Sequence, residues 1–252
     1  MNGIEMTSNS QQKEPNYKKQ LDINSLNKIN ESLLLLSPTE RINKIHEKFN
    51  DEFALTTSFG IQSSVLLHMF KKINKEENVK IIWVDTGYLP EETYKYVEEL
   101  EKRLDIKITT VQSEISPARM EAIFGKLWET NLSEDMDLYN KIRKVEPLEK
   151  ALNQLKISCW ASGVRRQQTN HRKNMKILDL VRGRFSLRPI LDWNQKDIYY
   201  YMEENSLPQH PLFEKGFSTV GDWHSSIPET SDTKGRATRF KGLKEECGLH
   251  ID

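Results

Sequence analysis

A cysteine lies five residues before the end of the chain, in the sequence Glu246-Cys247-Gly248-Leu249-His250. This polar, glycine-containing segment offers little for a core residue to pack against, so Cys247 is expected to be reactive rather than structural. Nearby cations would stabilise its thiolate, the nucleophilic form of cysteine. Cys159 lies instead in a run typical of a buried strand, where cysteine acts as a small apolar residue. The basic residues that precede Cys247 are Lys234, Arg236, Arg239, Lys241 and Lys244.

Two further polar segments each follow an apolar run. The first is Ser58-Phe59-Gly60-Ile61-Gln62-Ser63-Ser64, and the second is Asp85-Thr86-Gly87-Tyr88. Backbone N–H groups at a helix start could bind an anion in the first segment, although an ordinary strand-to-helix turn has the same composition. Asp85 could meet a ribose hydroxyl or cap a turn.

Adjacent arginines provide the third feature. Arg165 and Arg166 follow the run Trp160-Ala161-Ser162-Gly163-Val164, and the stretch continues to His171, Arg172 and Lys173. Guanidinium groups bind phosphate and sulfate oxygens through paired hydrogen bonds. The alternative is a charged face in contact with solvent.

Short β-branched runs alternate with amphipathic segments through the middle of the chain. This pattern predicts strands over 53–58, 79–84, 106–111, 157–161 and 185–190, and helices over 63–72 and 90–104. The order predicts βαβ crossovers and therefore an α/β fold with a mainly parallel, doubly wound sheet. Ligands of such sheets bind at the carboxyl ends of the strands, where the polar segments should meet.

The flanking parts differ from this alternation. Residues 1–20 are rich in Asn, Gln and Lys and are expected to be loosely ordered, whereas 21–50 should be helical. Ser37-Pro38-Thr39-Glu40 has the pattern of a helix N-cap with a capping box. Residues 51–206 are expected to form the α/β domain, in which Tyr199-Tyr200-Tyr201 packs along a helix. Periodicity fades over 207–252, which predicts an irregular, mobile C-terminal extension.

Composition excludes several classes of protein. Thirty-seven basic residues balance thirty-seven acidic ones, which argues against a generally basic nucleic-acid binder. No apolar run approaches the roughly 18 residues that span a bilayer, and no signal-peptide pattern is present. Two cysteines cannot build a disulfide framework or a four-thiolate metal site. We therefore expect a cytoplasmic protein that binds neither membrane nor nucleic acid.

Taken together, these segments resemble the family of 3′-phosphoadenylyl-sulfate (PAPS) and adenylyl-sulfate reductases of assimilatory sulfate reduction. The resemblance runs from about residue 50 to the C-terminus. It implies an adenine nucleotide α-hydrolase-like (PP-loop) fold, usually dimeric, with thioredoxin or glutaredoxin as the reductant. The segments that carry it are Ser58-Phe59-Gly60-Ile61-Gln62, Asp85-Thr86-Gly87-Tyr88-Leu89, Lys144-Val145-Glu146-Pro147, Arg165-Arg166-Gln167-Gln168, Val220-Gly221-Asp222-Trp223-His224 and Glu246-Cys247-Gly248-Leu249-His250.

One branch of this family, the adenylyl-sulfate reductases, holds a [4Fe–4S] cluster on a Cys-Cys pair and a Cys-x-x-Cys pair. Tyr139 and Asn140 stand at the first pair here, and Asp222 and Ser225 stand at the second. Such clusters normally need four thiolates, and the chain has two cysteines. The resemblance therefore points to the cluster-free branch, with no bound cofactor and no metal.

That branch reduces PAPS to sulfite and adenosine 3′,5′-bisphosphate through a cysteine S-sulfonate, which the resemblance places on Cys247. Alternatives are a cluster-free adenylyl-sulfate reductase, an ATP-dependent PP-loop adenylyltransferase and a non-catalytic nucleotide-binding module. The adenylyltransferase is disfavoured because Phe59 and Gln62 replace a Gly and an Asp of its loop. The expected substrate-binding residues are Ser58, Phe59, Gly60, Gln62, Ser63, Asp85, Thr86, Gly87, Lys144, Gly163, Arg165, Arg166, Arg236, Arg239 and His250.

Overall fold

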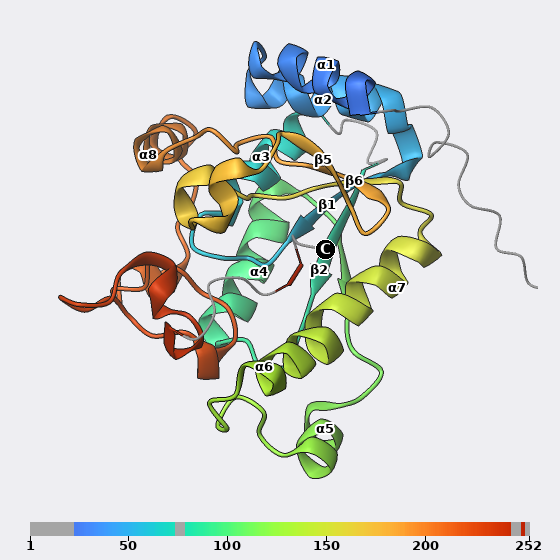
Figure 1. Ribbon diagram of the computed structural model, residues 1–252. Helices are drawn as coiled ribbons and strands as arrows, with labels where there is room; N and C mark the ends of the chain where they lie inside the picture. Colours follow the sequence, from blue (N-terminus) through green and yellow to red (C-terminus); the bar gives the residue numbers. More distant parts are fainter. Residues whose placement is uncertain (1–22, 74–78, 243–247, 250–252) are drawn as a thin grey trace, which may run out of the picture.

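The computed structural model describes residues 23–73, 79–242 and 248–249 (Figure 1). Six strands form one sheet in the order β3-β2-β1-β4-β6-β5, in which only β5 runs antiparallel to its neighbour. The mainly parallel, doubly wound α/β sheet is thereby confirmed, whereas β5 was not predicted. The strands are β1 (Phe53–Thr57), β2 (Lys80–Val84), β3 (Ile108–Val111), β4 (Cys159–Ala161), β5 (Leu178–Val181) and β6 (Arg184–Leu187).

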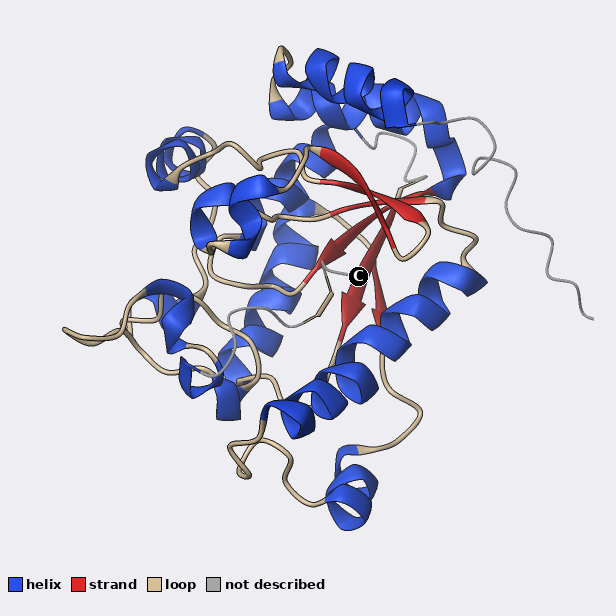
Figure 2. Ribbon diagram, viewed as in Figure 1, coloured by secondary structure: helices blue, strands red, loops and turns tan. Residues whose placement is uncertain are grey.

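Helices cover both faces of this sheet (Figure 2). On one face, Phe53 and Leu55 share a core with α2 (Pro38–Phe49), α3 (Ser63–Ile73) and α4 (Glu91–Leu104), and α8 (Gln195–Glu204) packs on α3. On the other face, Ala54 and Ile82 pack against α7 (Glu146–Gln154). Successive residues of a strand point to opposite faces, so a strand buried on both sides is apolar throughout. The remaining helices are α1 (Ile23–Leu34), α5 (Pro117–Phe124) and α6 (Ser133–Asn140).

The N-terminal helices begin where the sequence predicts. Ser37 caps α2, and Glu40 closes the capping box by accepting a hydrogen bond from the Ser37 backbone N–H. Buried Arg41 fixes this helix to the loop after β6, because its guanidinium makes two hydrogen bonds of 2.6 and 2.7 Å with the Asp192 carboxylate.

Among the described residues, no helix combines the length and apolar composition needed to cross a bilayer.

The three tyrosines on α8 divide into two groups. Tyr201 packs against Trp193, with 5.5 Å between ring centroids. Tyr199 and Tyr200 are 57% and 67% exposed, so the expected packing is wrong for these two residues. Their neighbours on the helix, Ile198 and Met202, take the buried positions instead.

Beyond α8 the described chain contains short 3₁₀ turns and one isolated bridge, between Ser226 and Arg239. This irregular structure was predicted, but the burial of its polar side chains, among them Asp222, was not. It packs on the carboxyl edge of the sheet: the Trp223 N–H donates to the Tyr88 carbonyl at 2.8 Å. Mobility was predicted for the whole of 207–252 and stays a prediction; within that range, 243–247 and 250–252 lie outside the described residues.

Candidate active site

A pocket opens at the carboxyl ends of β1 and β4, the point where the order of the parallel strands changes direction. Leu55 pairs with Ile81 of β2 and with Ala161 of β4, so the three parallel strands run toward the same edge, and β4 ends at the level of Leu55. Crevices at such switch points are the usual ligand sites of open α/β sheets. Ten of the predicted residues line this pocket: Ser58, Gly60, Gln62, Ser63, Thr86, Lys144, Gly163, Arg165, Arg236 and Arg239.

The loop after β1 places its small residues toward the pocket and its aromatic residue away from it. Phe59 has a φ of 47°, and its ring is fully buried against Trp83, with 5.3 Å between centroids. The left-handed conformation turns the side chain into the core, which corrects the expectation that Phe59 contacts substrate. Gly60 and Ser63 line the pocket, where the N-terminus of α3 presents the backbone N–H groups that suit an anion.

In the loop after β2, Thr86 and Leu89 line the pocket, and Thr86 is the one of them that was predicted. The Asp85 carboxylate accepts hydrogen bonds from the Gly87 N–H at 2.8 Å, from Tyr94 at 2.7 Å and from Gln112 at 2.6 Å. Asp85 therefore caps a turn, which was the alternative interpretation, and it is not part of the pocket lining. Gly87 serves the same turn: its φ is +74°, and a Cβ there would lie 2.7 Å from the Pro117 side chain.

Of the two adjacent arginines, only Arg165 reaches the pocket. The extended backbone of Arg165 and the 3₁₀ turn that follows direct neighbouring side chains in different directions. The Arg166 guanidinium donates instead to the Met175 carbonyl at 3.4 Å, which corrects the expectation for that residue. Its place is taken by Arg172, a buried pocket residue that sequence reasoning noted in the basic stretch but did not select.

Arg165 and Arg172 form what we call the arginine wall. Arg165 donates to the side-chain oxygens of Gln62 at 2.7 Å and Gln195 at 3.2 Å. These amides are neutral, so they satisfy donors without offsetting charge. Burial and, secondly, the positive charge of Arg172 lower the pKa of Arg165 to about 10. Two neighbouring positive charges, of which Arg172 is buried and Arg165 is partly buried, favour an anion beside them.

Three hydroxyl groups from separate parts of the chain add neutral donors to the pocket. The Oγ atoms of Ser63 and Ser162 and the Oγ1 atom of Thr219 are buried and have no hydrogen-bond partner among the described residues. A buried polar group without a partner is costly, so it usually has a functional explanation. Only Ser63 was predicted; Ser162 lies next to the predicted Gly163.

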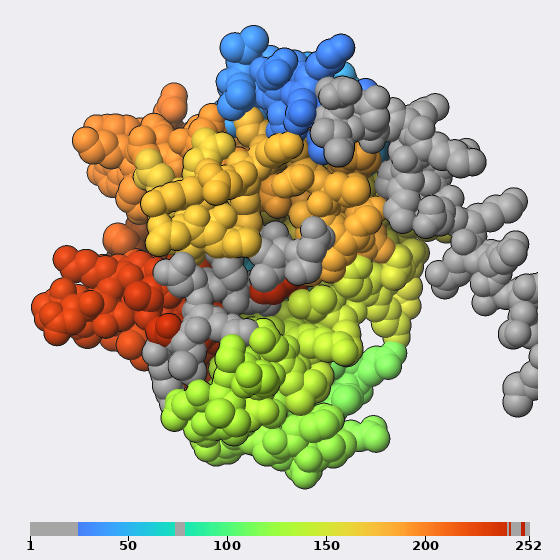
Figure 3. Space-filling view, in the orientation of Figure 1, coloured from blue at the N-terminus to red at the C-terminus, as the bar shows by residue number. Residues whose placement is uncertain are grey.

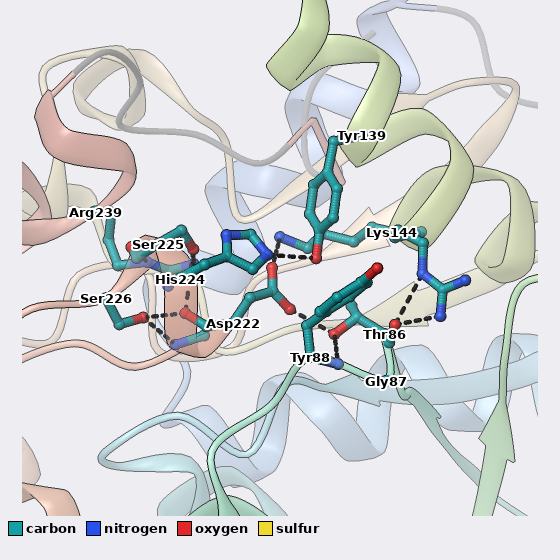
Figure 4. A network of polar contacts seen from close by, with 12 residues as sticks. Thr86, Gly87, Tyr88, Tyr139, Lys144, Asp222, His224, Ser225, Ser226 and Arg239 are labelled. Carbon is teal, nitrogen blue, oxygen red and sulfur yellow. Dashed lines mark hydrogen bonds and ion pairs between the residues drawn. The ribbon is translucent and has the colours of Figure 1, made fainter. Parts of the chain in front are cut away.

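Lys144 and Asp222 also line the pocket and form what we call the lysine wall (Figure 4). The Lys144 Nζ lies 2.6 Å from an Asp222 carboxylate oxygen, and both side chains are buried. A π-helical turn, Lys141–Val145, lies between α6 and α7 and buries Lys144 together with Ile142 and Arg143. Such turns are frequent at functional sites, but the sequence gives no periodic signal for one.

The Asp222 carboxylate is the centre of a polar network. Thr86 Oγ1 donates to it, and Arg143 donates in turn to the Thr86 carbonyl at 2.8 Å. Burial alone would raise the pKa of Asp222, but Lys144, His224 and Thr86 lower it to about 2. Burial lowers the pKa of His224 to about 4, so the imidazole is neutral near pH 7.

The four positions at which cluster-containing relatives carry cysteines are filled with packed side chains. Tyr139 is fully buried, and its hydroxyl lies 3.0 Å from His224 Nε2, as Figure 4 shows. Asn140, Asp222 and Ser225 are also buried. Within the described ranges, no three His, Cys, Asp or Glu side chains are arranged to hold a metal ion.

The C-terminal extension brings more cations to the pocket. Arg239 is buried beside Gly221, where a Cβ would lie 2.1 Å from the guanidinium, so glycine makes room for the arginine. Its Nε donates to the Ser225 carbonyl at 3.1 Å, and its guanidinium lies 5.0 Å from the Phe240 ring centroid. Arg236 also lines the pocket, as predicted.

The two remaining predicted residues, Cys247 and His250, lie outside the described residues. Between them, Leu249 lines the pocket and packs against the cluster that contains Leu148 and Trp160. Cys159 is fully buried, and burial raises the pKa of its thiol well above the ordinary value. It therefore behaves as the inert apolar residue that was predicted.

Comparisons with known proteins agree with this geometry. Residues 52–228 match the model of the phosphoadenosine phosphosulfate reductase domain. The chain is 50% identical over 228 residues to a phosphoadenosine 5′-phosphosulfate reductase of Synechococcus sp., covering 90% of this chain and 97% of the relative. The corresponding protein of Synechocystis sp. is 48% identical over 81% of this chain and 82% of its own length.

Solved structures place the fold. A crystal structure of PAPS reductase from Candida auris in a phosphate complex superposes with a TM-score of 0.71 at 26% identity, covering 82% of this chain and 98% of that one. FMN adenylyltransferase from Candida glabrata gives 0.56 at 14% identity, covering 83% and 77%, which shows a shared fold alone. The adenine nucleotide α-hydrolase-like fold is thereby confirmed, and the adenylyltransferase alternative gains no functional support. The chain belongs to the phosphoadenosine phosphosulfate reductase family.

Proposed function

We propose that this protein reduces PAPS to sulfite and adenosine 3′,5′-bisphosphate, with Cys247 as the nucleophile and thioredoxin as the electron donor. One observation carries the proposal beyond family membership: Leu249 lines the same pocket as Arg165 and Arg172. The segment that contains the proposed nucleophile thus ends at a cationic, nucleotide-sized site on the carboxyl edge of the sheet. An S-sulfonate intermediate needs this combination of thiol and anion site.

The reaction begins with attack of the Cys247 thiolate on the sulfur of the sulfonate group. The Cys–S bond forms as the bond from that sulfur to the bridging oxygen breaks, and adenosine 3′,5′-bisphosphate leaves with the electron pair. A thioredoxin thiolate then attacks Cys247 Sγ, which releases sulfite and leaves a mixed disulfide. The second thioredoxin thiol resolves that disulfide, so thioredoxin is oxidised by two electrons and Cys247 is regenerated.

The first step brings an anionic nucleophile to an anionic substrate, so cations must screen the repulsion. The arginine wall, Arg236 and Arg239 supply positive charge around the pocket. In a partly buried site such charges act more strongly than in water, because the local dielectric is low. The hydroxyl groups of Ser63, Ser162 and Thr219 are placed to donate to phosphate or sulfonate oxygens.

The proposal also includes the cellular compartment, the cofactor requirement and the protein partners. A free catalytic thiol that is recycled by thioredoxin requires a reducing compartment, so we place the protein in the cytoplasm. With two cysteines in the whole chain, the catalysis proposed uses no iron–sulfur cluster. The family resemblance supports a homodimer, with thioredoxin or glutaredoxin as the transient partner.

Intact-protein mass spectrometry tests the intermediate directly. The protein is mixed with PAPS in the absence of thioredoxin, and the adduct is mapped by peptide analysis. We expect a gain of one SO₃ group on Cys247 and its loss on addition of reduced thioredoxin. Cys159→Ser is the matched control and should form the same adduct, because Cys159 is fully buried; Cys247→Ser should form none. An adduct on another residue, or none in the wild-type protein, would overturn the proposal.

A further inference from the structure

The turn between β5 and β6 has an unusual residue at its first position. Arg182 and Gly183 connect the two strands, with φ angles of 46° and 75°. Two-residue hairpin turns with positive φ at both positions favour Asn, Asp or Gly at the first of them. An arginine there pays a backbone cost that the turn itself does not require. The side chain therefore needs an explanation.

The Arg182 guanidinium binds the end of the chain. One terminal nitrogen donates to the Gly248 carbonyl and the other to the Leu249 carbonyl, each at 2.8 Å. The Nε atom donates to a Glu149 carboxylate oxygen, also at 2.8 Å. The planar fork of arginine suits such paired acceptors, and a lysine could not reproduce its geometry.

Glu149 and Arg184 hold this guanidinium in place. Glu149 belongs to α7 and lies between Arg182 and Arg184, one on each carboxylate oxygen. Arg184 is fixed further by its hydrogen bond to the Ile157 carbonyl at 3.1 Å. Glu149 on helix α7 and its second partner Arg184 on strand β6 are thus rigid supports for the guanidinium. Arg182 and Glu149 are also mostly shielded, with side chains 20% and 26% exposed.

The anchored residues lie at the pocket. Leu249 packs against Leu148 and Leu152 of α7 and is part of the pocket lining. Figure 3 shows residues 248–249 as a small red area between the orange β5–β6 region and the yellow-green α7. Cys247 is joined to Gly248 by a peptide bond, and consecutive Cα atoms are 3.8 Å apart. Fixing the Gly248 carbonyl therefore limits where the cysteine can lie.

We propose that Arg182, held by Glu149, is a positioning residue that anchors the backbone of residues 248–249 at the pocket and so directs Cys247 toward the bound nucleotide. This inference rests on the proposed function, in which Cys247 is the nucleophile. In this proposal Arg182 acts through the backbone of residues 248–249. Its contribution is orientation, and a displacement of about 1 Å in a reacting group costs about a hundredfold in rate.

The substitution Arg182→Asn separates positioning from folding. Asparagine adopts positive φ more readily than arginine, so the turn should be retained while the guanidinium is removed. The matched control is Lys156→Asn, which removes a positive charge from an exposed residue that also has positive φ, 56°, and lies outside the pocket lining. Arg182→Lys and Glu149→Gln test the fork geometry and its support.

Four measurements are made on each variant: the thermal midpoint, the affinity for adenosine 3′,5′-bisphosphate, amide hydrogen exchange of the C-terminal peptide, and the single-turnover rate of S-sulfonate formation with PAPS. For Arg182→Asn we expect an unchanged or higher midpoint, nucleotide affinity within about twofold, faster exchange of the C-terminal peptide and adduct formation slower by about ten- to a hundredfold. Glu149→Gln and Arg182→Lys should fall between it and the wild-type protein. Lys156→Asn should match the wild-type protein in all four.

Three results would overturn the inference. Unchanged exchange of the C-terminal peptide in Arg182→Asn would show that the guanidinium is no anchor. Faster exchange with an unchanged adduct rate would show that the anchor does not position Cys247. An equal loss of adduct rate in Lys156→Asn would show that the loss comes from removing a positive charge or from changing a residue with positive φ, and not from removing the anchor. If the wild-type protein itself formed no adduct on Cys247, the proposed function would fail and the inference with it, a result distinct from the other three.

Discussion

The arginine wall and the lysine wall face the same pocket but balance their charges in opposite ways. Lys144 lies 2.6 Å from the carboxylate of Asp222, which is buried with it. Arg165 donates to two neutral amides and has a second arginine, Arg172, as its charged neighbour. The lysine wall therefore pairs its cation with a carboxylate, whereas the side chains to which Arg165 donates in the arginine wall are neutral.

This difference separates a structural role from a binding role. A buried ion pair is strongly destabilised when one partner is removed, because the other charge is then left in a medium of low dielectric. Like charges held together cost stability, and an anionic ligand relieves that cost. Loss of the lysine wall should therefore be seen mainly in folding, and loss of the arginine wall mainly in nucleotide binding.

The largest effect is expected from Asp222→Asn. The substitution keeps the shape of the side chain but leaves Lys144 buried without its carboxylate. We expect the free energy of unfolding at pH 7 to fall by about 3–5 kcal/mol, the usual cost of breaking a buried pair. Urea denaturation measures the change. Glu99→Gln is the control: it removes a half-exposed partner of Arg103 on α4 and should cost less than about 1 kcal/mol.

The pH dependence of stability checks the cause of that loss. In the folded protein the pKa of Asp222 is about 2, below its ordinary value of 3.8. The ionised carboxylate therefore stabilises the fold above about pH 4, and this contribution is lost as the pH falls toward 2. Stability in that interval should decline less steeply for Asp222→Asn than for the wild-type protein. Parallel profiles would show that the carboxylate charge is not the source of the effect.

Arg165→Gln should instead act on ligand binding. Removing one charge-assisted contact costs about 1.5–3 kcal/mol, which is about ten- to a hundredfold in the dissociation constant of adenosine 3′,5′-bisphosphate. The thermal midpoint without nucleotide should stay the same or rise, since the repulsion from Arg172 is removed. Isothermal titration calorimetry and thermal denaturation measure the two quantities.

Arg166→Gln is the matched control for this substitution. It removes the same charge one residue further along the chain, from a side chain that lies outside the pocket lining. Nucleotide affinity should change by less than about threefold. Equal losses of nucleotide affinity in Arg165→Gln and Arg166→Gln would mean that the overall positive charge of this region, and not the arginine wall, attracts the nucleotide.

The contrast between these neighbours shows what a sequence can and cannot predict. Strand and helix periodicity identified β1, β2, β3, β4 and β6 and the edge of the sheet at which the loops meet. Strand β5 was missed because its four residues alternate only briefly and its pairing depends on a tight turn at Arg182-Gly183. The capping box at Ser37 was recognisable because it uses contacts only three residues apart.

The direction in which a loop side chain points is harder to predict from the sequence. Phe59, Asp85, Gly87 and Arg166 lie in the correct segments, yet the backbone conformation turns each of them away from the pocket. Asp222 was noted in a segment shared with the family and as a cysteine replacement, but not as a site residue, because its partners Lys144 and Thr86 are 78 and 136 residues away in the chain. Contacts of that kind are set by tertiary structure, and a single sequence gives no signal for them.

A smaller effect concerns the 3′-phosphate of the substrate. The arginine wall, Arg236 and Arg239 offer more positive charge than the phosphosulfate end alone would use. We expect kcat/KM for PAPS to exceed that for adenylyl sulfate by at least about tenfold, the gain from a single charge-assisted contact at the lower end of its range. Added salt should reduce the ratio, because it screens exposed charges. Equal kcat/KM values at low salt would contradict the preference and leave the cysteine chemistry unaffected.

The smallest expected effect distinguishes the contribution of neutral hydrogen-bond donors to nucleotide binding from that of the cations. Ser162 and Ser186 are both buried, and the Oγ atom of each lacks a hydrogen-bond partner, but only Ser162 lines the pocket. Ser162→Ala and Ser186→Ala each remove a buried hydroxyl that makes no hydrogen bond within the protein, so both should change the free energy of unfolding by less than about 1 kcal/mol. Only Ser162→Ala should weaken binding of adenosine 3′,5′-bisphosphate, by about two- to tenfold, the worth of one neutral hydrogen bond. Calorimetric titration of the two variants measures the difference. Unchanged affinity in Ser162→Ala would mean that the cations alone hold the nucleotide. The neutral hydroxyl groups would then contribute nothing to binding, and the two walls would differ only in charge.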